Sequence, residues 1–213
     1  MNKIIKGDVT LDELHLTRLL DLSDVEVKGS FLCRYNNLTN LEGSPHTVGG
    51  WFECHDNELN SLKGAPKIVK GNFLCDENNL IDLVGSPKLV KTFRCDNNKL
   101  TSLKGAPKKT NSSFYCYNNQ LTSLKGAPKT VKGSFCCVDN PLIDLIGIPK
   151  TISSNFVISE SLKNKFTEEY IRSLSNIEGE VIYWNIVNRD YYEDGDEDDE
   201  EDWEDGDLDG NVW

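Results

Sequence analysis

The stretch 114–129, FYCYNNQLTSLKGAPK, is one of six copies of the pattern F-x-C-x-x-N-x-L-x-x-L-x-G-x-P. The copies are marked by Cys33, Cys54, Cys75, Cys95, Cys116 and Cys137, at spacings of 21, 21, 20, 21 and 21 residues. A fixed period of this length is typical of a solenoid, in which each coil buries its apolar edge against the next coil. The sequence therefore predicts a stack of coils rather than a single globular core.

Each copy places its residue types where a flat coil needs them. The Phe and Cys are two residues apart, so both side chains lie on the same face of a short strand. The Gly permits a positive φ, and the Pro fixes the bend that follows. The Asn stands where the chain leaves the strand. We predict a structural role for it, because its amide can pair backbone groups that would otherwise cost about 1 to 3 kcal/mol each.

The motif F-x-C-x-x-N-x-L resembles the L-x-L-x-x-N-x-L core of a leucine-rich repeat. More narrowly, the copies resemble the short leucine-rich repeats of bacteriophage and prophage proteins, over residues 9–158. The resemblance implies a β-rich solenoid of about seven coils of about 20–22 residues. Such a solenoid has a parallel sheet along one side and little helix on the convex side. The resemblance implies no shared activity.

The repeat divides the chain into four predicted regions. Residues 1–30 are expected to form a degenerate opening coil, in which Val9 and Leu11 take the Phe and Cys places. The leucine-rich repeat solenoid, the C-terminal helix–strand cap and an acidic tail follow in order, at 31–158, 159–189 and 190–213. Caps of this kind cover the apolar end of a solenoid.

Within the cap, residues 161–177 show apolar side chains at helical spacing, which predicts a short amphipathic helix. These side chains are Phe166, Tyr170, Ile171 and Leu174. Thr167 is the expected N-cap of the helix. Residues 179–188 alternate and are β-branched, which predicts a final strand.

The net charge of −12 comes from the tail, because residues 190–213 hold 14 acidic residues and no Lys or Arg. The rest of the chain has 21 acidic and 23 basic residues. Six of the seven cysteines occupy an inward position of the repeat, so we interpret them as small apolar side chains, not as disulfides. Together with an N-terminus that lacks a long apolar run, this predicts a reducing cytoplasm and no membrane span.

Function is expected on the face of the sheet that points away from the Phe and Cys side chains, since residues there vary from coil to coil. Leu32, Leu74, Tyr115, Cys136 and Val157 form a partly apolar stripe on this face. The stripe fits either ordinary scattered surface residues or a protein-binding surface with aromatic anchors. The candidate partner-binding residues are Leu32, Arg34, Tyr35, Leu74, Arg94, Tyr115 and Tyr117, with Trp203, Trp213, Asp198, Asp199, Glu200 and Glu201 in the tail.

A second group consists of lysines around the G-x-P turn and its exit. They are Lys63, Lys67, Lys70, Lys88, Lys91, Lys104, Lys108, Lys109, Lys125, Lys129, Lys132 and Lys150. Three interpretations stay open: a solvated edge that blocks association, phosphate contacts to nucleic acid, or a docking place for the acidic tail. Direct nucleic-acid binding is not expected, because the tail would repel the same phosphates.

No catalytic constellation is predicted. The run Cys54–Asp56 offers a thiol, an imidazole and a carboxylate, but consecutive strand residues point to opposite faces, which leaves Cys54 inward. No cysteine pair has zinc-site spacing, and the segment 205–210 matches only the first half of a calcium loop. We expect no enzyme activity, no cofactor and no metal.

Two hypotheses remain. In the first, the chain is a non-enzymatic binding module, phage-encoded, that binds and inhibits a host protein such as a defence factor through the sheet face and the tail. In the second, the tail is a nucleic-acid mimic that occupies the basic groove of a DNA- or RNA-binding protein. An extended tail has one charge per ~4.7 Å, against ~1.7 Å for duplex DNA, so it is closer to a single strand. The oligomeric state stays open.

Overall fold

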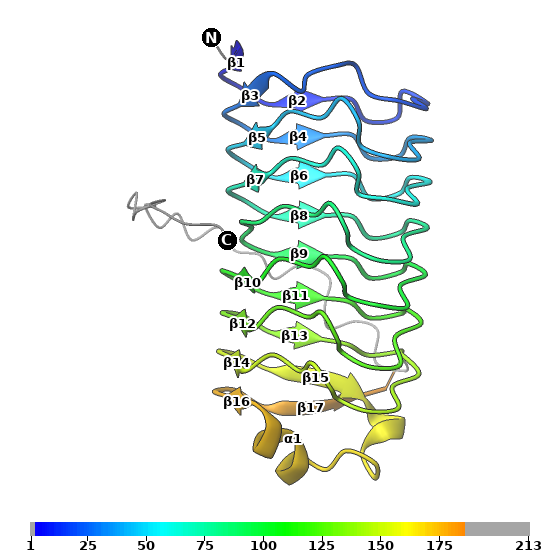
Figure 1. Ribbon diagram of the computed structural model, residues 1–213, viewed down its shortest axis with the longest axis vertical. Helices are drawn as coiled ribbons and strands as arrows, with labels where there is room; N and C mark the ends of the chain where they lie inside the picture. The colour runs from blue at the N-terminus through cyan, green and yellow to red at the C-terminus, as the bar shows by residue number, and fades with distance from the viewer. Residues whose placement is uncertain (1–2, 186–213) are drawn as a thin grey trace, which may run out of the picture.

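The computed structural model describes residues 3–185, which form a solenoid of stacked parallel coils (Figure 1). One side of the stack is a nine-stranded parallel sheet, here called the main sheet, with the order β17-β15-β13-β11-β9-β8-β6-β4-β2. Its strands are β2 (Val9–Thr10), β4 (Phe31–Leu32), β6 (Phe52–Glu53), β8 (Phe73–Leu74), β9 (Phe93–Arg94), β11 (Phe114–Tyr115), β13 (Phe135–Cys136), β15 (Phe156–Ser159) and β17 (Val181–Trp184). The leucine-rich repeat solenoid predicted from the sequence is therefore confirmed.

The main sheet is longer than the seven coils that the repeats suggested, because both ends of the described chain pair into it. At the N-terminal end, Val9 of the degenerate coil is in register with Phe31. At the C-terminal end, Val181 of β17 is in register with Phe156.

Two smaller parallel sheets run along the neighbouring side of the stack, at the left of Figure 1. The first contains β1 (Lys3–Ile5), β3 (Val25–Val27), β5 (Thr47–Val48) and β7 (Ile68–Val69), and the second contains β10 (Lys109–Thr110), β12 (Thr130–Val131), β14 (Thr151–Ile152) and β16 (Asn176–Ile177). Between them only an isolated bridge joins Ile68 to Leu89. The interruption falls in the 20-residue coil, whose missing residue lies between Pro87 and Cys95.

The core is built from repeated columns, one residue per coil. Seven phenylalanine rings from Phe31 to Phe156 stack with centroids 5.3–5.9 Å apart and interplanar angles of 6–18°. The inward cysteines and the two leucines of each repeat are buried beside this stack. Each inward thiol donates to a backbone carbonyl of the next coil, as Cys75 does to Arg94 at 3.1 Å. The seven cysteines are free, and burial raises the pKa of their thiols.

The repeated asparagines form a second continuous column and join adjacent coils. In Asn57, Oδ1 accepts from the Leu38 N–H at 3.0 Å, and Nδ2 donates to the carbonyls of Cys33, Cys54 and His55 at 3.0–3.2 Å. The other five asparagines repeat this arrangement, and all six are nearly fully buried. The predicted structural role of the Asn column is confirmed: each amide serves backbone groups of two coils.

Two turn positions in each repeat have a left-handed backbone. The repeat glycines have φ between 88° and 104°, as the sequence predicts. A Cβ atom on these glycines would also meet the backbone of the preceding coil, at 2.4 Å in Gly105, so no other residue fits. The residue that precedes each repeat Asn has φ between 48° and 53° although none is glycine. Tyr35, Asp56 and Asn118 are three of these non-glycine residues with a positive φ.

The C-terminal cap consists of a 3-10 turn η1 (Glu160–Leu162), the helix α1 (Glu168–Leu174), β16 and β17. The side chain of Thr167 accepts a hydrogen bond from the N–H of Tyr170, so the predicted N-cap is present. Phe166 and Ile171 are buried against the last coil. Tyr170 and Leu174, predicted on the same apolar face, are 45% and 42% exposed although both lie within the helix, so only Ile171 of α1 is buried.

Candidate functional site

The candidate site is the outer face of the main sheet, which is the face opposite to the Phe and Cys side chains. Parallel register places the residue after each Phe beside its counterpart in the next coil, so Leu74 lies beside Arg94 and Arg94 beside Tyr115. Leu32, Leu74, Arg94 and Tyr115 are each half-buried on this face, as is Arg34. The fold therefore brings together the sheet residues that the sequence singled out.

Carboxylates hold the arginine at the N-terminal end of this face. Nε and Nη2 of Arg34 both donate to Oδ2 of Asp12, at 3.0 and 2.7 Å, and Nη1 lies 3.0 Å from Glu53 Oε2. The ring of His55 lies 2.8 Å from Asp56 and 3.7 Å from Glu53. Burial lowers the pKa of His55, but the hydrogen bonds to Glu53 and Asp56 outweigh it, so the net shift is upward. Tyr35, 49% exposed, packs edge-on against the His55 ring.

A second network lies in the middle of the face. Arg94 donates to both oxygens of Asp96, at 3.2 and 3.4 Å, and to the Tyr117 hydroxyl at 3.0 Å. Its guanidinium lies 5.6 Å from the centre of the Tyr115 ring. Asp96 is fully buried under these partners. Burial opposes the charge of Arg94, but the carboxylates of Asp96 and Asp76 raise its pKa. The phenol of Tyr117 also has a raised pKa, from burial and from the charge of Asp96.

Asp76 lies between these two networks, near Arg94 and His55, but belongs to no ion pair among residues 3–185. Its Oδ1 is buried and accepts no hydrogen bond within residues 3–185. Burial, and then the charge of Asp96, raise the pKa of Asp76 to about 6. Next to it, the pKa of Glu77 is raised by burial and by Asp56. The middle of the outer face therefore presents two carboxylates, Asp76 and Glu77, that make no ion pair with Arg34 or Arg94.

The C-terminal third of the face is apolar, and part of the predicted stripe is buried there. Cys136, Val138 and Val157 form a small hydrophobic cluster with exposures of 6%, 4% and 1%. Tyr115, Tyr117, Ile182 and Trp184 pack against it. The expectation that Cys136 and Val157 are displayed to solvent is therefore wrong. The physical reason is that β17 extends the sheet, and its side chains cover the neighbouring strand.

The sequence analysis missed the residues that give this face its charge. They are Asp12, Glu53, His55, Asp56, Asp76, Glu77 and Asp96, which outnumber the two arginines. Their positions beside the repeat Phe and Cys could be read from the sequence, but the variation of these positions between coils was interpreted as a sign that the side chains are exposed to solvent. In the structure Glu53 and Asp96 are buried, because neighbouring arginines and tyrosines fold over them. The tail candidates Trp203, Trp213, Asp198, Asp199, Glu200 and Glu201 lie outside the described residues.

The run Cys54–Asp56 does not form a reactive site. The Cys54 thiol is buried and donates to the Leu74 carbonyl, whereas His55 lies on the outer face, so the two side chains do not meet. No group of His, Cys, Asp and Glu in the described part of the chain is arranged to hold a metal.

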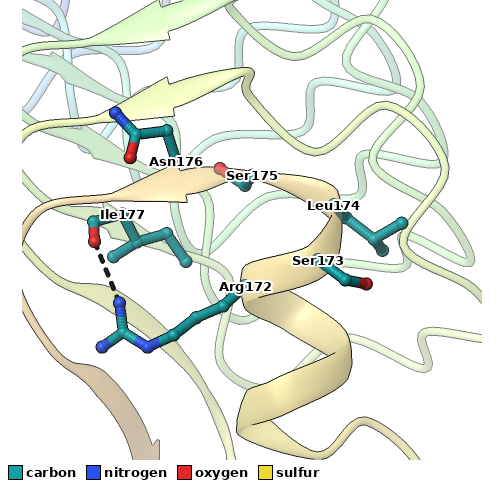
Figure 2. A pocket seen from close by; sticks show the side chains of 6 residues that line it. All are labelled: Arg172, Ser173, Leu174, Ser175, Asn176 and Ile177. Carbon is teal, nitrogen blue, oxygen red and sulfur yellow. Dashed lines mark hydrogen bonds between the residues drawn. The ribbon is translucent and has the colours of Figure 1, made fainter.

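A depression of about 420 Å³ lies beside α1, and Figure 2 shows the side chains that line it. It is lined by Arg172, Ser173, Leu174, Ser175, Asn176 and Ile177. Arg172 donates to the carbonyls of Ile177 and Gly179 at 2.9 and 3.0 Å, and to Glu168 at 2.8 Å. These bonds tie the helix to the last coil, so the depression is part of the cap.

Comparison with known proteins supports the fold. A solved structure described as a Shigella effector LRR domain is similar to 85% of this chain, over 82% of its own length, with a TM-score of 0.57. The sequence identity is 22%, so the likeness concerns the fold alone. No family model and no curated protein matches the sequence. No helix between residues 3 and 185 is long and apolar enough to cross a membrane.

Proposed function

We propose that the chain is a non-enzymatic protein-binding module and that its outer sheet face holds the partner. The observation that carries this proposal is the layout of that face, where an acidic middle adjoins an aromatic and apolar end. Leucine-rich solenoids are scaffolds that display one residue per coil on a rigid frame. Aromatic and arginine side chains on such a frame are frequent anchors of protein interfaces.

The face suits a partner that presents a basic side chain next to an apolar one. Asp76 and Glu77 make no ion pair with Arg34 or Arg94, so an incoming Lys or Arg would offset the repulsion between Asp76 and Asp96. Leu74 lies on the same coil as Asp76, and Tyr115 lies two strands further along the sheet, so both offer an adjoining apolar contact. Charge complementarity of this kind determines which partner is accepted and how fast it associates.

Phage-like repeats suggest the identity of the partner. The proposal extends to a host protein that the chain inhibits in the host cytoplasm, with a defence factor as one candidate. The resemblance of the repeats to phage and prophage proteins supports this extension. It is separate from the sheet-face proposal, which holds for any protein partner.

The proposal is tested by affinity capture with the full-length chain and two matched double variants. The face variant is Leu74→Ala with Tyr115→Ala, which removes apolar contacts but leaves the Arg94–Asp96 pair intact. The control variant is Ile81→Ala with Ile143→Ala, since these side chains are 59% and 65% exposed but lie in the loops. We expect the partner to bind wild type and control equally and to be lost from the face variant. Equal capture by all three chains would refute the sheet-face proposal.

The second candidate function, a nucleic-acid mimic, rests on the 14 acidic residues of the tail. It predicts that deletion of residues 190–213 abolishes capture, whereas the sheet-face proposal predicts that most of it remains. Salt separates the two further. Binding through a tail of exposed charges falls steeply as the Debye length drops from ~30 Å at 0.01 M to ~3 Å at 1 M, and apolar contacts persist.

A further inference from the structure

A row of lysines runs along the stack at the entrance to the smaller sheets. The residue after each repeat proline is Lys67, Lys88, Lys108, Lys129 and Lys150 in five successive coils, and we call this row the lysine ladder. Three of the four neighbouring pairs in the row are joined by a backbone hydrogen bond, and the exception, Lys88 and Lys108, falls at the interruption between the smaller sheets. The N–H of Lys88 donates to the Lys67 carbonyl at 3.0 Å, and those of Lys129 and Lys150 donate to the preceding lysine at 2.8 Å.

The lysine ladder is exposed and has no counter-charge in the described body. All five side chains are exposed, and none of them belongs to an ion pair among residues 3–185. The contrast with Lys63 is informative, because that lysine is paired with Glu42 at 2.6 Å. The row continues to His46 before Lys67 and to Asn176 after Lys150, so it contains no acidic residue.

The spacing of the ladder is set by the fold. Neighbouring parallel strands are about 4.8 Å apart, so five lysines span about 19 Å in a straight row. Like charges held this close repel, and each flexible Lys side chain gains from a nearby carboxylate. The ladder therefore matches, in charge and in spacing, an extended chain with regularly spaced negative charges.

This chain carries such a segment. Residues 190–209 contain 14 acidic residues in 20, which in an extended chain amounts to one carboxylate per ~4.7 Å. That spacing equals the distance between coils. The 28 residues after residue 185 can reach ~92 Å, more than enough to cross from the end of β17 to the ladder and run along it.

We propose that residues 190–209 bind along the lysine ladder of the same molecule. The acidic segment would supply the counter-charge that these five lysines lack among residues 3–185. The ladder lies beside the smaller sheets and not on the outer face of the main sheet, so this contact leaves the proposed partner site open. It also makes the ladder unavailable to other polyanions, including nucleic acid.

The test measures how fast individual lysines react with an amine-labelling reagent in the full-length chain, read by mass spectrometry. The comparison chain carries Asn and Gln in place of the 14 acidic residues of 190–209, a change that leaves the coils untouched. We expect the five ladder lysines to react several-fold more slowly in wild type than in the neutral-tail chain at low salt. Lys99 and Lys163 lie outside the ladder and should react equally in both chains. The difference should disappear at 1 M salt, where the Debye length is ~3 Å.

Three outcomes would overturn the proposal. Equal labelling rates in the two chains at low salt would mean that the segment does not occupy the ladder. Loss of the protection on dilution would mean that the segment belongs to a second copy, because an intramolecular contact does not depend on concentration. A single-stranded oligonucleotide could protect the ladder lysines of the neutral-tail chain and also displace the acidic segment of the wild type. That result would assign the ladder to nucleic acid. Protection that persists on dilution and resists the oligonucleotide supports the contact proposed here.

Discussion

Replacing a single repeat asparagine tests whether the amide column, and not apolar burial alone, holds adjacent coils together. Asn57→Ala removes the Oδ1 that accepts from the Leu38 N–H and the Nδ2 that serves the carbonyls of Cys33, Cys54 and His55. These backbone groups lie in the interior, where water does not replace the lost amide without a cavity.

The magnitude follows from the number of groups left unpaired. A buried donor or acceptor without a partner costs about 1 to 3 kcal/mol, and a carbonyl, which has two lone pairs, costs less than an N–H. One N–H and three carbonyls lose a partner, and the smaller side chain adds a void. We therefore expect a loss of about 3 to 5 kcal/mol in the free energy of unfolding, a large part of the ~5–15 kcal/mol that a domain has.

The assay is urea denaturation followed by circular dichroism, with Asn37→Ala as the matched control. Asn37 is exposed and makes only a 3.4 Å side-chain bond to Glu58, so its replacement should change stability by less than about 0.5 kcal/mol. A loss below about 1 kcal/mol in Asn57→Ala, or equal losses in the two variants, would refute the reasoning that the amide column is what joins the coils.

Three further predictions follow from the turns, the buried thiols and the outer face. Gly105→Ala should destabilise the chain by about 2 kcal/mol or more, because φ is 97° and the new Cβ meets backbone at 2.4 Å; Gly7→Ala, with nothing within 4 Å, is the control in the same thermal melt. The seven thiols should react with a thiol reagent only after unfolding, because burial raises their pKa; fast labelling of the native chain would contradict the buried Cys column. Asp76 has a folded pKa raised to about 6, so the native state holds its proton more tightly than the unfolded state and stability should fall as pH rises from about 4 to about 6. Asp76→Asn should flatten this slope and raise the free energy of unfolding by about 1 to 3 kcal/mol at pH 7. A cationic partner should bind the wild type less tightly below pH 6. If urea titrations at several pH values give the same slope for Asp76→Asn as for wild type, another group is responsible.

Much of the fold was predictable because the residue types of the repeat define the shape of each coil. The Phe, Cys, Leu, Asn and Gly columns each recur at a fixed offset, and each offset has one physical use in a flat coil. The degenerate opening coil was also visible, since Val9 and Leu11 keep their places when the Asn is absent. The helix Glu168–Leu174 was predicted too long, because the apolar period continues past the point where the chain turns into β16.

The site was less predictable, because exposure on a sheet face depends on what neighbouring strands contribute. Glu53 and Cys136 occupy equivalent positions in different coils, and the sequence suggested that both face solvent. Arg34 from the preceding coil folds over the carboxylate, and apolar side chains near the C-terminal strands cover the thiol. The side chains that cover Glu53 and Cys136 are distant from them in the sequence, so no local sequence pattern predicts that these two residues are buried.

The sequence by itself determined the stack of coils, its period and the inward columns. The reason is that the pattern occurs six times, so each coil packs against a neighbour with the same inward residue types. Only the tertiary structure decided how the outer face is divided into an acidic middle and an apolar end, and that the five ladder lysines make no ion pair among residues 3–185. These features arise from residues about 20 positions apart, placed side by side at the distance between neighbouring strands. Repetition fixes the frame through identical contacts, whereas the surface depends on contacts between unlike residues, and those exist only after the coils have stacked.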